Sequence, residues 1–584
     1  MKILGISGID GTGDFKRRHE PGLEERVYRI TQGHDSAAAL IVDGDVVAAV
    51  AEERVSRRKH TGDFPLGAIR ACLAHAGLAP ADLDEVAHSF DYEPYRALYA
   101  LDPVAAELYR DVLSRDAFAA RVRAALPDLP ADRVRHVEHH LAHAASAYLT
   151  SGWDECLVAV MDGMGEAHGA TVYTASGGRL EPRQRISAAD SIGILYSLIT
   201  LHLGFDFNAD EYKVMGLAPY GDPDRFRPWF EETVELRDDG GWTIPLLRLG
   251  LTRSERENHT RAREHLGRHV MPARAVDGEI TADHRDLAAS LQACLDRAVV
   301  HLCGHWGRRL RSPRLALAGG VALNTTANAR LLEAGIFDEI YVQPAAADDG
   351  SALGAALHRA AVAGEVVNRR SPTPFYGPAH GPAEVEAAVE RFADRIDVRR
   401  LPSLEATCAA AAELIAAGEV VAWYRGRMEF GPRALGHRSI LADPGRPEMR
   451  DRVNALVKLR ESFRPFAPAV SLEQVDRWFA VAPGTELPYM NVNVTVRAEH
   501  AADLPATTHV DGSARVQTVS RADNADFHVL LTAVGERTGR EVVLNTSFNV
   551  KGQAIVNTPT EAIETFLGTG IGALLLEDTL IRRR

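Results

Sequence analysis

The segment 137–145, Val-Glu-His-His-Leu-Ala-His-Ala-Ala, constrains the chain more than any other stretch. Its Ala and Leu content predicts a helix, in which His139 and His143, four residues apart, share one face. The apolar run 157–161 predicts a buried strand that ends on Asp162, and Asp348 and Asp349 open a later acidic turn. Imidazoles with carboxylates suit Fe, Mn or Zn. A His-x3-His pair alone is more often a surface or hydrogen-bonded pair, so the neighbouring motifs decide.

Length and composition narrow the class of protein. A chain of 584 residues is too long for one core and predicts two or three domains. Its net charge of −14 argues against a general nucleic-acid or membrane surface. Five scattered cysteines without Cys-x2-Cys spacing indicate a reducing compartment and no thiolate zinc site. Because neither a signal peptide nor a long apolar run is found, we expect a cytoplasmic protein.

Alternating apolar strands and helical stretches predict an α/β fold. Asp43-Gly44-Asp45 between two apolar runs predicts a hairpin. Residues 251–275 are rich in Arg, Glu and His, and we expect a solvated lid or, more simply, an ordinary surface loop. Expected helices cover 71–76, 139–149, 192–203 and 284–305, and expected strands cover 157–161, 315–318 and 339–343.

A change in composition at 366–374 predicts a linker, because polar residues and two prolines follow a small-residue helix. The expected domains are therefore 1–365 and 366–584. Within the second, residues 383–392 and 404–417 favour helices and 420–424 favours a strand.

Two glycine turns point to a nucleotide cleft in the first domain. An apolar strand breaks at Gly319-Gly320 before a helical segment, and the acidic turn at 348–350 repeats that plan. Glycines let backbone N–H groups approach phosphates, and a helix N-terminus favours negative charge. One such turn is usually structural, but two beside Asp162-Gly163 indicate nucleotide binding.

These motifs together resemble a known family. The turn 319–324, the histidine pair and the late Asp-x-Gly resemble the ATPases of tRNA threonylcarbamoyl-adenosine synthesis, which have the actin-like fold. The whole chain more closely resembles the NodU/CmcH O-carbamoyltransferases, a family that includes tobramycin carbamoyltransferase. Three further motifs carry the resemblance: Gly-His-Asp-Ser-Ala-Ala at 33–38, Glu-Glu-Arg-Val-Ser-Arg-Arg-Lys-His at 52–60, and Asp-Glu-Tyr-Lys-Val-Met-Gly-Leu-Ala-Pro-Tyr-Gly at 210–221.

The resemblance implies that domain 1–365 is a duplicated actin-like domain that binds ATP and a divalent metal, with Fe(II) preferred over Mg, Mn or Zn. By motif position the metal ligands are His139, His143, Asp162 and Asp348, with Asp349 as the alternative to Asp348. The implied nucleotide-site residues are Asp162, Gly163, Lys213, Gly216, Gly319, Gly320, Asn324, Asp348 and Gly350.

His34 and Lys59 are the implied catalytic residues, near the carbamoyl group and the acceptor hydroxyl. A histidine that titrates near neutral pH suits proton transfer. The simpler interpretations are a turn residue for His34 and a solvated charge for Lys59.

In the second domain, basic residues occur in turns beside proline and glycine, as bidentate recognition of a phosphate requires. Surface ion pairs would explain one such residue but poorly explain several beside an Asn-Thr-Ser loop. The resemblance implies a YrdC-like domain that binds carbamoyl phosphate, the co-substrate, through Arg433, Lys458, Arg464, Arg515 and Ser547.

The expected activity is ATP-dependent carbamoyl transfer to a hydroxyl of a small-molecule natural product, as in antibiotic tailoring, through carbamoyl-adenylate. A longer segment than the family pattern, Ile9–Gln32, lies near the acceptor end, so we do not carry over an aminoglycoside acceptor. No nucleic-acid or membrane partner is expected, and a homodimer is left open. The alternatives are a tRNA threonylcarbamoyl-type enzyme, disfavoured by the acidic charge, and a regulatory ATPase without transfer chemistry.

Overall fold

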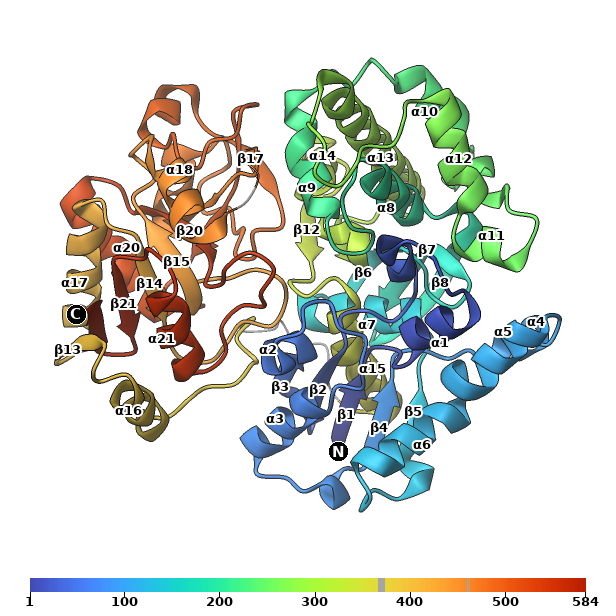
Figure 1. Cartoon of the computed structure of the whole chain (residues 1–584), viewed down its shortest axis with the longest axis horizontal. Helices are drawn as coiled ribbons and strands as arrows, with labels where there is room; N and C mark the ends of the chain where they lie inside the picture. The colour runs from blue at the N-terminus through green and yellow to red at the C-terminus, as the bar shows by residue number, and fades with distance from the viewer. Residues whose placement is uncertain (366–372, 460, 462) are drawn as a thin grey trace. The chain divides into compact units, whose positions relative to one another are not determined.

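The computed structural model describes residues 1–365, 373–459, 461 and 463–584 (Figure 1). The chain forms two compact units: Met1–Glu53 with His60–Ser371, and Arg54–Lys59 with Pro372–Arg584. The short segment 54–59 thus belongs with the second unit, which differs from the expected boundary. Most of the predicted linker at 366–374 lies outside the described residues.

Unit 1 contains two five-stranded sheets of the same design. In each, the first strand is antiparallel to a hairpin on one side and parallel to two strands on the other. This repeat confirms the α/β class and the duplicated domain. In sheet order the strands are β3 (Asp45–Ala51), β2 (Ala37–Val42), β1 (Lys2–Ile6), β4 (Glu85–His88) and β5 (Val134–His136), then β12 (Glu339–Val342), β11 (Arg314–Ala318), β6 (Glu155–Met161), β7 (His168–Ser176) and β8 (Arg179–Ser187).

Two helices form the middle layers of unit 1. Helix α15 (Asp348–Val362) packs on β1 and β2, α7 (His139–Ser151) packs on β6 and β11, and the two helices pack on each other. A Cβ atom on Gly354 would lie 1.7 Å from the carbonyl oxygen of Ala142, so glycine is needed at this helix crossing. Small residues therefore bring the two helix N-termini close together.

Further helices and a short hairpin surround these layers. They are α3 (Leu66–Ala76), α4 (Arg96–Tyr99), α5 (Pro103–Leu108), α6 (Arg115–Ala125), α8 (Ile192–His202), α9 (Glu211–Leu217), α10 (Arg227–Thr233), α13 (Ala282–Leu310) and α14 (Thr325–Glu333), with β9 (Glu235–Leu236) and β10 (Trp242–Thr243). Helix α2 (Glu52–Ser56) begins in unit 1 and continues into the segment 54–59 of unit 2.

The expectation of a solvated loop at 251–275 is wrong. Helices α11 (Arg253–Glu257) and α12 (Thr260–His269) occupy most of it. Thr252 and Glu255 form a capping box that starts α11, and Ala262 and Leu266, four residues apart, bury one face of α12. Two buried residues in a charged stretch suffice for a helix but give little apolar periodicity.

The segment Ile9–Gln32 folds over this helical pair. Helix α1 (Thr12–His19) is followed by a 3₁₀ turn, and the buried Lys16 Nζ donates to the carbonyl oxygens of Val27 and Ile30. The Glu20 carboxylate accepts from Ser254 Oγ at 3.1 Å and pairs with Arg253 at 3.1 Å. The long segment is therefore an ordered element fixed to α11.

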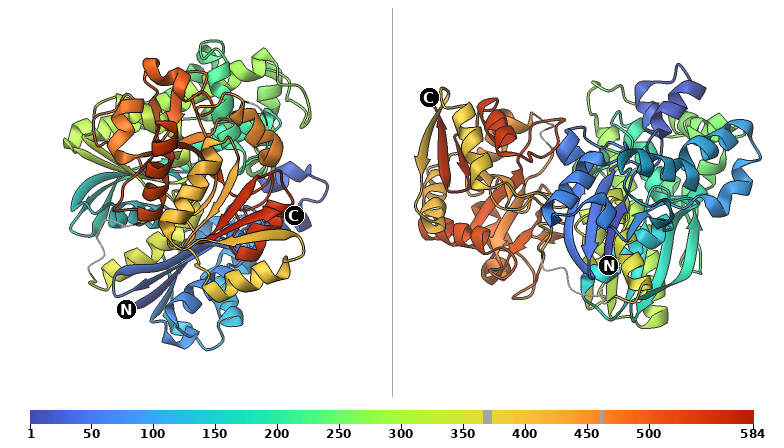
Figure 2. Two further views of the ribbon diagram at one scale, coloured as in Figure 1. Left: turned by 90° about the vertical axis from the view of Figure 1, so that its left-hand side faces the viewer. Right: turned by 90° about the horizontal axis from the view of Figure 1, so that it is seen from below.

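Unit 2 is built on one mixed eight-stranded sheet with helices on both faces (Figure 2). Helices α17 (Leu404–Ala416) and α20 (Ala525–Thr538) cover one face, and α16 (Pro382–Arg391), α18 (Met449–Val453) and α21 (Pro559–Leu567) contribute to the core on the other. In sheet order the strands are β13 (Ile396–Arg400), β22 (Thr579–Arg583), β21 (Ala573–Leu576), β14 (Val421–Tyr424), β15 (Arg438–Ala442), β20 (Val542–Ser547), β16 (Ala467–Ser471) and β19 (Gln517–Val519). Helix α19 (Val475–Trp478) and the pair β17 (Asn493–Thr495) and β18 (Ser513–Arg515) complete the unit.

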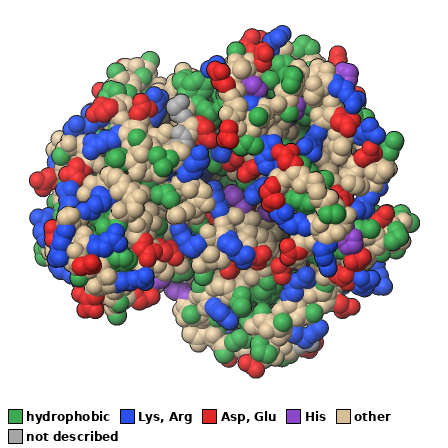
Figure 3. Space-filling model, viewed as in Figure 1, with side chains coloured by type: hydrophobic (Ala, Val, Ile, Leu, Met, Phe, Trp, Pro, Cys, Tyr) green, Lys and Arg blue, Asp and Glu red, His purple; other side chains and the backbone are tan. Residues whose placement is uncertain are grey.

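On the face shown in Figure 3, Lys and Arg side chains are interspersed with Asp and Glu. Among the described residues, no helix combines the length and apolar character needed to span a bilayer.

Candidate functional site

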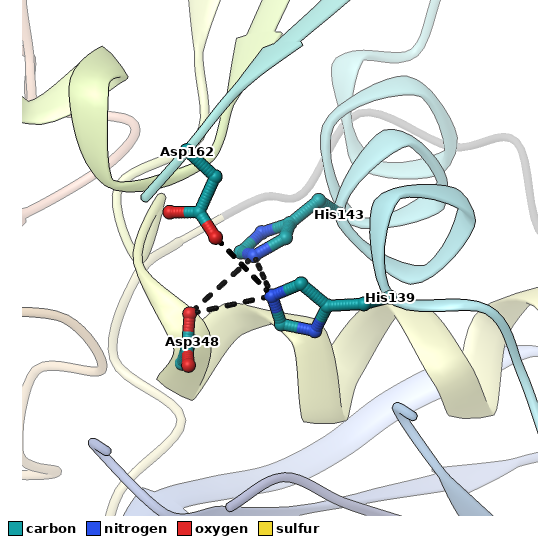
Figure 4. Close-up of side chains that lie close together, drawn as sticks. All are labelled: His139, His143, Asp162 and Asp348. Carbon is teal, nitrogen blue, oxygen red and sulfur yellow. Dashed lines mark hydrogen bonds and ion pairs between the residues drawn. The ribbon is translucent and has the colours of Figure 1, made fainter. Parts of the chain in front are cut away.

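Four predicted metal ligands meet where three elements of unit 1 begin or end. His139 is the first residue of α7, Asp348 is the first residue of α15, and Asp162 directly follows β6. One turn into α7, His143 lies on the same helix face as His139. The helical spacing and the crossing of α7 with α15 thus bring the four side chains together (Figure 4).

The four side chains converge through single atoms. His139 Nε2 lies 3.1 Å from His143 Nε2, 3.4 Å from Asp162 Oδ2 and 3.5 Å from Asp348 Oδ1. His143 Nε2 lies 3.6 Å from the same Asp348 oxygen. One ligand atom from each residue falls within 4.8 Å of all the others. Two nitrogens and two oxygens therefore surround one point.

The electrostatics of this cluster suit a cation. His139, His143 and Asp162 are buried, and burial opposes protonation of His139, yet the Asp348 and Asp162 carboxylates outweigh it and hold the His139 pKa above its ordinary range. His139 Nδ1 lies 3.1 Å from the carbonyl oxygen of Ser89, which fixes Nδ1 as the donor and directs the Nε2 lone pair into the cluster. The residues fit a divalent metal with mixed nitrogen and oxygen ligands.

The structure separates the two adjacent aspartates. Asp348 Oδ1 lies within the cluster, whereas Asp349 Oδ1 accepts from the Gly350 N–H at 3.0 Å. Ser351 Oγ donates to the Asp348 carbonyl oxygen at 2.6 Å. The geometry thus favours Asp348 as the ligand, and Gly350 lies inside the first turn of α15.

The cluster is joined to the first glycine turn. Because β6 and β11 are parallel neighbours, Asp162 and Gly319 follow strand ends at the same sheet edge. Asp162 Oδ1 accepts from the Gly320 N–H at 2.9 Å, while its Oδ2 faces His139. One carboxylate therefore links the candidate metal ligands to the turn expected to meet the nucleotide phosphates.

Replacing Gly319 with Ala is expected to destabilise unit 1 by at least ~1–3 kcal/mol, the cost of backbone strain at one residue. Gly319 has φ 89°, and a Cβ atom there would lie 2.3 Å from the Met161 carbonyl oxygen. The measurement is denaturant unfolding. Gly335→Ala is the matched control, because Gly335 has φ 59° and open space around it. Equal losses in both variants would contradict the close approach at Gly319.

Other residues expected at the nucleotide have protein partners in the structure. Asn324 caps α14 and exchanges two hydrogen bonds with Gln292, at 2.9 and 3.0 Å. Lys213 Nζ lies 2.8 Å from Asp210 Oδ2, on the same helix, α9, as Gly216. Gly163 follows Asp162, and a Cβ atom there would lie 4.0 Å from Ile194 Cδ1, an ordinary van der Waals contact.

The two expected catalytic residues belong to different units. His34 lies in unit 1, with Nε2 3.0 Å from Thr31 Oγ1, and burial lowers its pKa. Its neighbour Asp35 forms a second close group with Glu53 and His60. Lys59 is exposed and belongs to the segment 54–59 of unit 2.

That segment is attached to unit 2 through arginines. Arg57 donates to the carbonyl oxygens of Ala554 and Ile555, at 2.9 and 2.5 Å. Arg54 donates to that of Gly431 at 2.7 Å. These bonds explain why a stretch so early in the sequence belongs to the second unit.

Within unit 2, Lys458 and Ser547, both expected at carbamoyl phosphate, are in contact. The buried Lys458 Nζ donates to the carbonyl oxygens of Ser547 and Asn549, to Ser547 Oγ at 3.1 Å and to Asn549 Oδ1 at 2.7 Å. The ammonium therefore holds the loop that follows β20 in shape.

The loop that carries Arg433 rests on the ends of two strands. Asn545 Nδ2 donates to the Ala434 carbonyl oxygen, and Gln517 Nε2 donates to that of Leu435 at 2.8 Å. Asn545 and Gln517 also bond each other at 2.8 Å. Arg433 is thereby held near the strands that carry Arg515 and Ser547, each two residues from one of these amides.

Arg464 completes the predicted basic set, with Nη1 3.5 Å from Glu461 Oε2. Among the predicted cations in the described part of unit 2, Arg433 and Arg464 lie in connections between strands, Lys458 ends a helical turn (Asn454–Lys458) and Arg515 is the last residue of β18.

Comparison of the chain with models of protein families identifies its family. The carbamoyltransferase N-terminus model matches residues 27–99 and 101–357, and the carbamoyltransferase C-terminus model matches 412–583. The chain belongs to the carbamoyltransferase family. It is a transferase, and both matched regions contain the residues described above.

Two relatives show what this carbamoyltransferase is similar to in sequence. It is 40% identical to the nodulation protein NolNO of Sinorhizobium fredii, over 100% of this chain and 83% of the relative. It is 37% identical to the 3'-hydroxymethylcephem-O-carbamoyltransferase of Streptomyces clavuligerus, over 46% of this chain and 49% of the relative. The family match begins at residue 27, so most of the segment Ile9–Gln32 lies outside it.

The sequence did not reveal several residues that position the site of this carbamoyltransferase. The Glu166 carboxylate accepts from the backbone N–H groups of His139, at 3.0 Å, and Asp91, at 2.7 Å, and so fixes the start of α7. Burial and the nearby Glu138 raise the pKa of Glu166. A Gly-x-Gly-Glu run after an apolar strand was the available signal.

Proposed function

We propose that this carbamoyltransferase makes carbamoyl-adenylate from carbamoyl phosphate and ATP, and transfers the carbamoyl group to a hydroxyl of a small molecule. The observation that carries the proposal is the Asp162 carboxylate, which connects a four-residue metal-type cluster to the Gly319-Gly320 turn. That arrangement suits a nucleotide whose phosphates are bound by backbone N–H groups beside a cation.

The proposed reaction has three steps, in each of which the atoms balance. In unit 2, water splits carbamoyl phosphate into carbamate and inorganic phosphate. A carbamate oxygen then attacks the α-phosphorus of ATP in unit 1 and displaces pyrophosphate. Finally the acceptor hydroxyl attacks the carbonyl carbon, and the bond to AMP breaks. Adenylation supplies a good leaving group, and positioning of both reactants accelerates the last step.

The residues of unit 1 have assigned roles in these steps. His139, His143, Asp162 and Asp348 would hold a divalent metal, which supplies Lewis-acid stabilisation of phosphate charge. The Gly319-Gly320 turn orients the phosphates. His34 is the candidate that accepts the hydroxyl proton, because burial lowers its pKa and so keeps the imidazole in the neutral form that can take up a proton.

Unit 2 is assigned the carbamoyl phosphate. Arg433, Arg464 and Arg515 would bind its phosphate oxygens, and Lys458 shapes the Ser547 loop beside them. Charge-assisted hydrogen bonds from turn-held arginines give direction as well as strength.

A hydroxyl acceptor is supported by the cephem relative, whose name specifies O-carbamoyl transfer to a hydroxymethyl group. Gln32 Nε2 donates to the carbonyl oxygen of Gly165 at 2.7 Å, which connects the segment Ile9–Gln32 to the loop after Asp162. Because this segment is connected to the candidate site, we do not carry over the acceptor of any relative to this enzyme.

The test measures AMP and pyrophosphate formed from ATP, with and without carbamoyl phosphate, in the presence of Fe(II) or Mg(II). Carbamoyl-phosphate-dependent pyrophosphate release is the expected result. If ATP is consumed equally without carbamoyl phosphate, with or without candidate acceptor alcohols, the regulatory ATPase is the better explanation. Dependence on threonine and tRNA would instead indicate the threonylcarbamoyl enzyme.

A further inference from the structure

A buried glutamate lies within the Arg433 loop of unit 2. Glu429 lies in the connection between β14 and β15 and is 3% exposed. Its Oε1 accepts from three backbone N–H groups, those of Leu435 at 2.8 Å, His437 at 2.8 Å and Arg438 at 3.1 Å. Hydrogen bonds to an ionised acceptor are about twice as strong as neutral ones. One carboxylate therefore closes the whole turn 430–438.

A buried arginine braces the same connection through the opposite backbone groups. Arg438 is fully buried, and its Nη atoms donate to the carbonyl oxygens of Arg425 at 2.7 Å, Gly426 at 3.0 Å and His437 at 3.0 Å. Its guanidinium lies 3.5 Å from the centre of the Tyr424 ring. Glu429 thus accepts hydrogen bonds from backbone N–H groups of this connection, and Arg438 donates hydrogen bonds to its backbone carbonyl oxygens.

A carboxylate in a loop that binds phosphate needs an explanation, because it would repel an anion it faced. Neither Glu429 oxygen faces solvent: Oε1 is enclosed by N–H groups, and Oε2 is buried without a hydrogen-bond partner. The carboxylate therefore does not contact a substrate. Its contacts are with the backbone on the C-terminal side of Arg433.

We propose that Glu429 is a positioning residue, which fixes the direction of Arg433 by closing the turn on which that arginine lies. The proposal rests on the proposed function, in which Arg433 binds the phosphate of carbamoyl phosphate. On the far side of the turn, Asn545 and Gln517 hold Ala434 and Leu435. The turn is then fixed from within and from the sheet, so the backbone from which the Arg433 side chain extends has a defined position.

The experiment compares E429A and E429Q with wild type. We expect E429A to raise the KM for carbamoyl phosphate about 100-fold, the effect of misplacing a binding group by about 1 Å, with the KM for ATP unchanged. E429Q should recover most of the loss, because an amide oxygen can accept from the same three N–H groups. E386Q is the control, since Glu386 is a half-exposed glutamate of the same unit.

The outcomes separate the two claims. A merely structural role predicts equal damage to both KM values, or equal damage in E429A and E429Q, and either result would overturn the positioning role. An unchanged KM for carbamoyl phosphate in E429A would overturn it too. If E429A does not fold, the test is how much inorganic phosphate raises the melting temperature of E429Q, of R433A and of the wild type. A rise for E429Q that is smaller than for the wild type but larger than for R433A supports the positioning role. A rise equal to that of R433A contradicts it. A wild-type enzyme that does not use carbamoyl phosphate refutes the proposed function itself.

Discussion

Changing His139 or His143 to Asn is expected to remove the bound metal and to weaken both adenylation and transfer. Each variant deletes one of four converging ligand atoms, and the remaining three offer a cation fewer donors. Loss of a partner outside the ligand shell already costs about 10–100-fold in metal affinity, so loss of a ligand should cost more. Metal stoichiometry by elemental analysis measures this directly, independently of activity.

The control for this experiment is His202→Asn. His202 is also a buried histidine of unit 1, with Nε2 2.8 Å from the Met271 carbonyl oxygen, but it lies outside the cluster. It should retain full metal content while losing a comparable hydrogen bond. Retained stoichiometry in His139→Asn and His143→Asn would contradict the ligand assignment, whatever happened to the rate.

The four candidate ligands were accessible from the sequence because each lies at a position that local rules identify. The i, i+4 spacing places His139 and His143 on one face, an apolar run ends at Asp162, and an acidic turn opens a small-residue helix at Asp348. The motif position had favoured Asp348 over Asp349, but the contacts that place its carboxylate beside the histidines depend on how α15 crosses α7. That crossing is set by the contact of Gly354 with Ala142, two residues far apart in the chain.

Long-range contacts account for the differences between expectation and structure. Arg54 and Arg57 bond to carbonyl oxygens of residues 431, 554 and 555, so the segment 54–59 belongs to unit 2 although it lies early in the chain. The apolar face of α12 consists of two buried residues, Ala262 and Leu266, too few to outweigh the charged composition.

In the second unit too, the sequence does not reveal contacts between residues far apart in the chain. Turn-held arginines are visible as Arg beside Pro and Gly, but the residues that orient them are not. Glu429 and Gln517 form hydrogen bonds with backbone groups of Leu435. Every residue has such backbone groups, so the sequence does not show which of them a given side chain will contact. Sequence therefore identified the groups expected to touch a ligand better than the groups that hold them in place.

Replacing Lys458 with Met is expected to abolish use of carbamoyl phosphate while sparing transfer from preformed carbamoyl-adenylate. Lys458 Nζ donates to acceptors of Ser547 and Asn549, and Met leaves those acceptors without a cation. Each hydrogen bond to a charged group contributes about 1.5–3 kcal/mol, so losing two of them without compensation corresponds to at least ~100-fold. Pyrophosphate release from ATP and carbamoyl phosphate measures the first reaction, and AMP release from added carbamoyl-adenylate measures the second.

Lys551→Met is the matched control, because Lys551 is an exposed lysine in the same loop, two residues after Asn549. It should leave both reactions unchanged. Arg464→Ala should reproduce the Lys458→Met pattern if both residues serve carbamoyl phosphate. If transfer from carbamoyl-adenylate fails as severely as the overall reaction in Lys458→Met, the assignment of carbamoyl phosphate to unit 2 and of adenylate chemistry to unit 1 is wrong. The test of which unit performs which reaction is therefore the difference between the rate of pyrophosphate release and the rate of transfer from carbamoyl-adenylate.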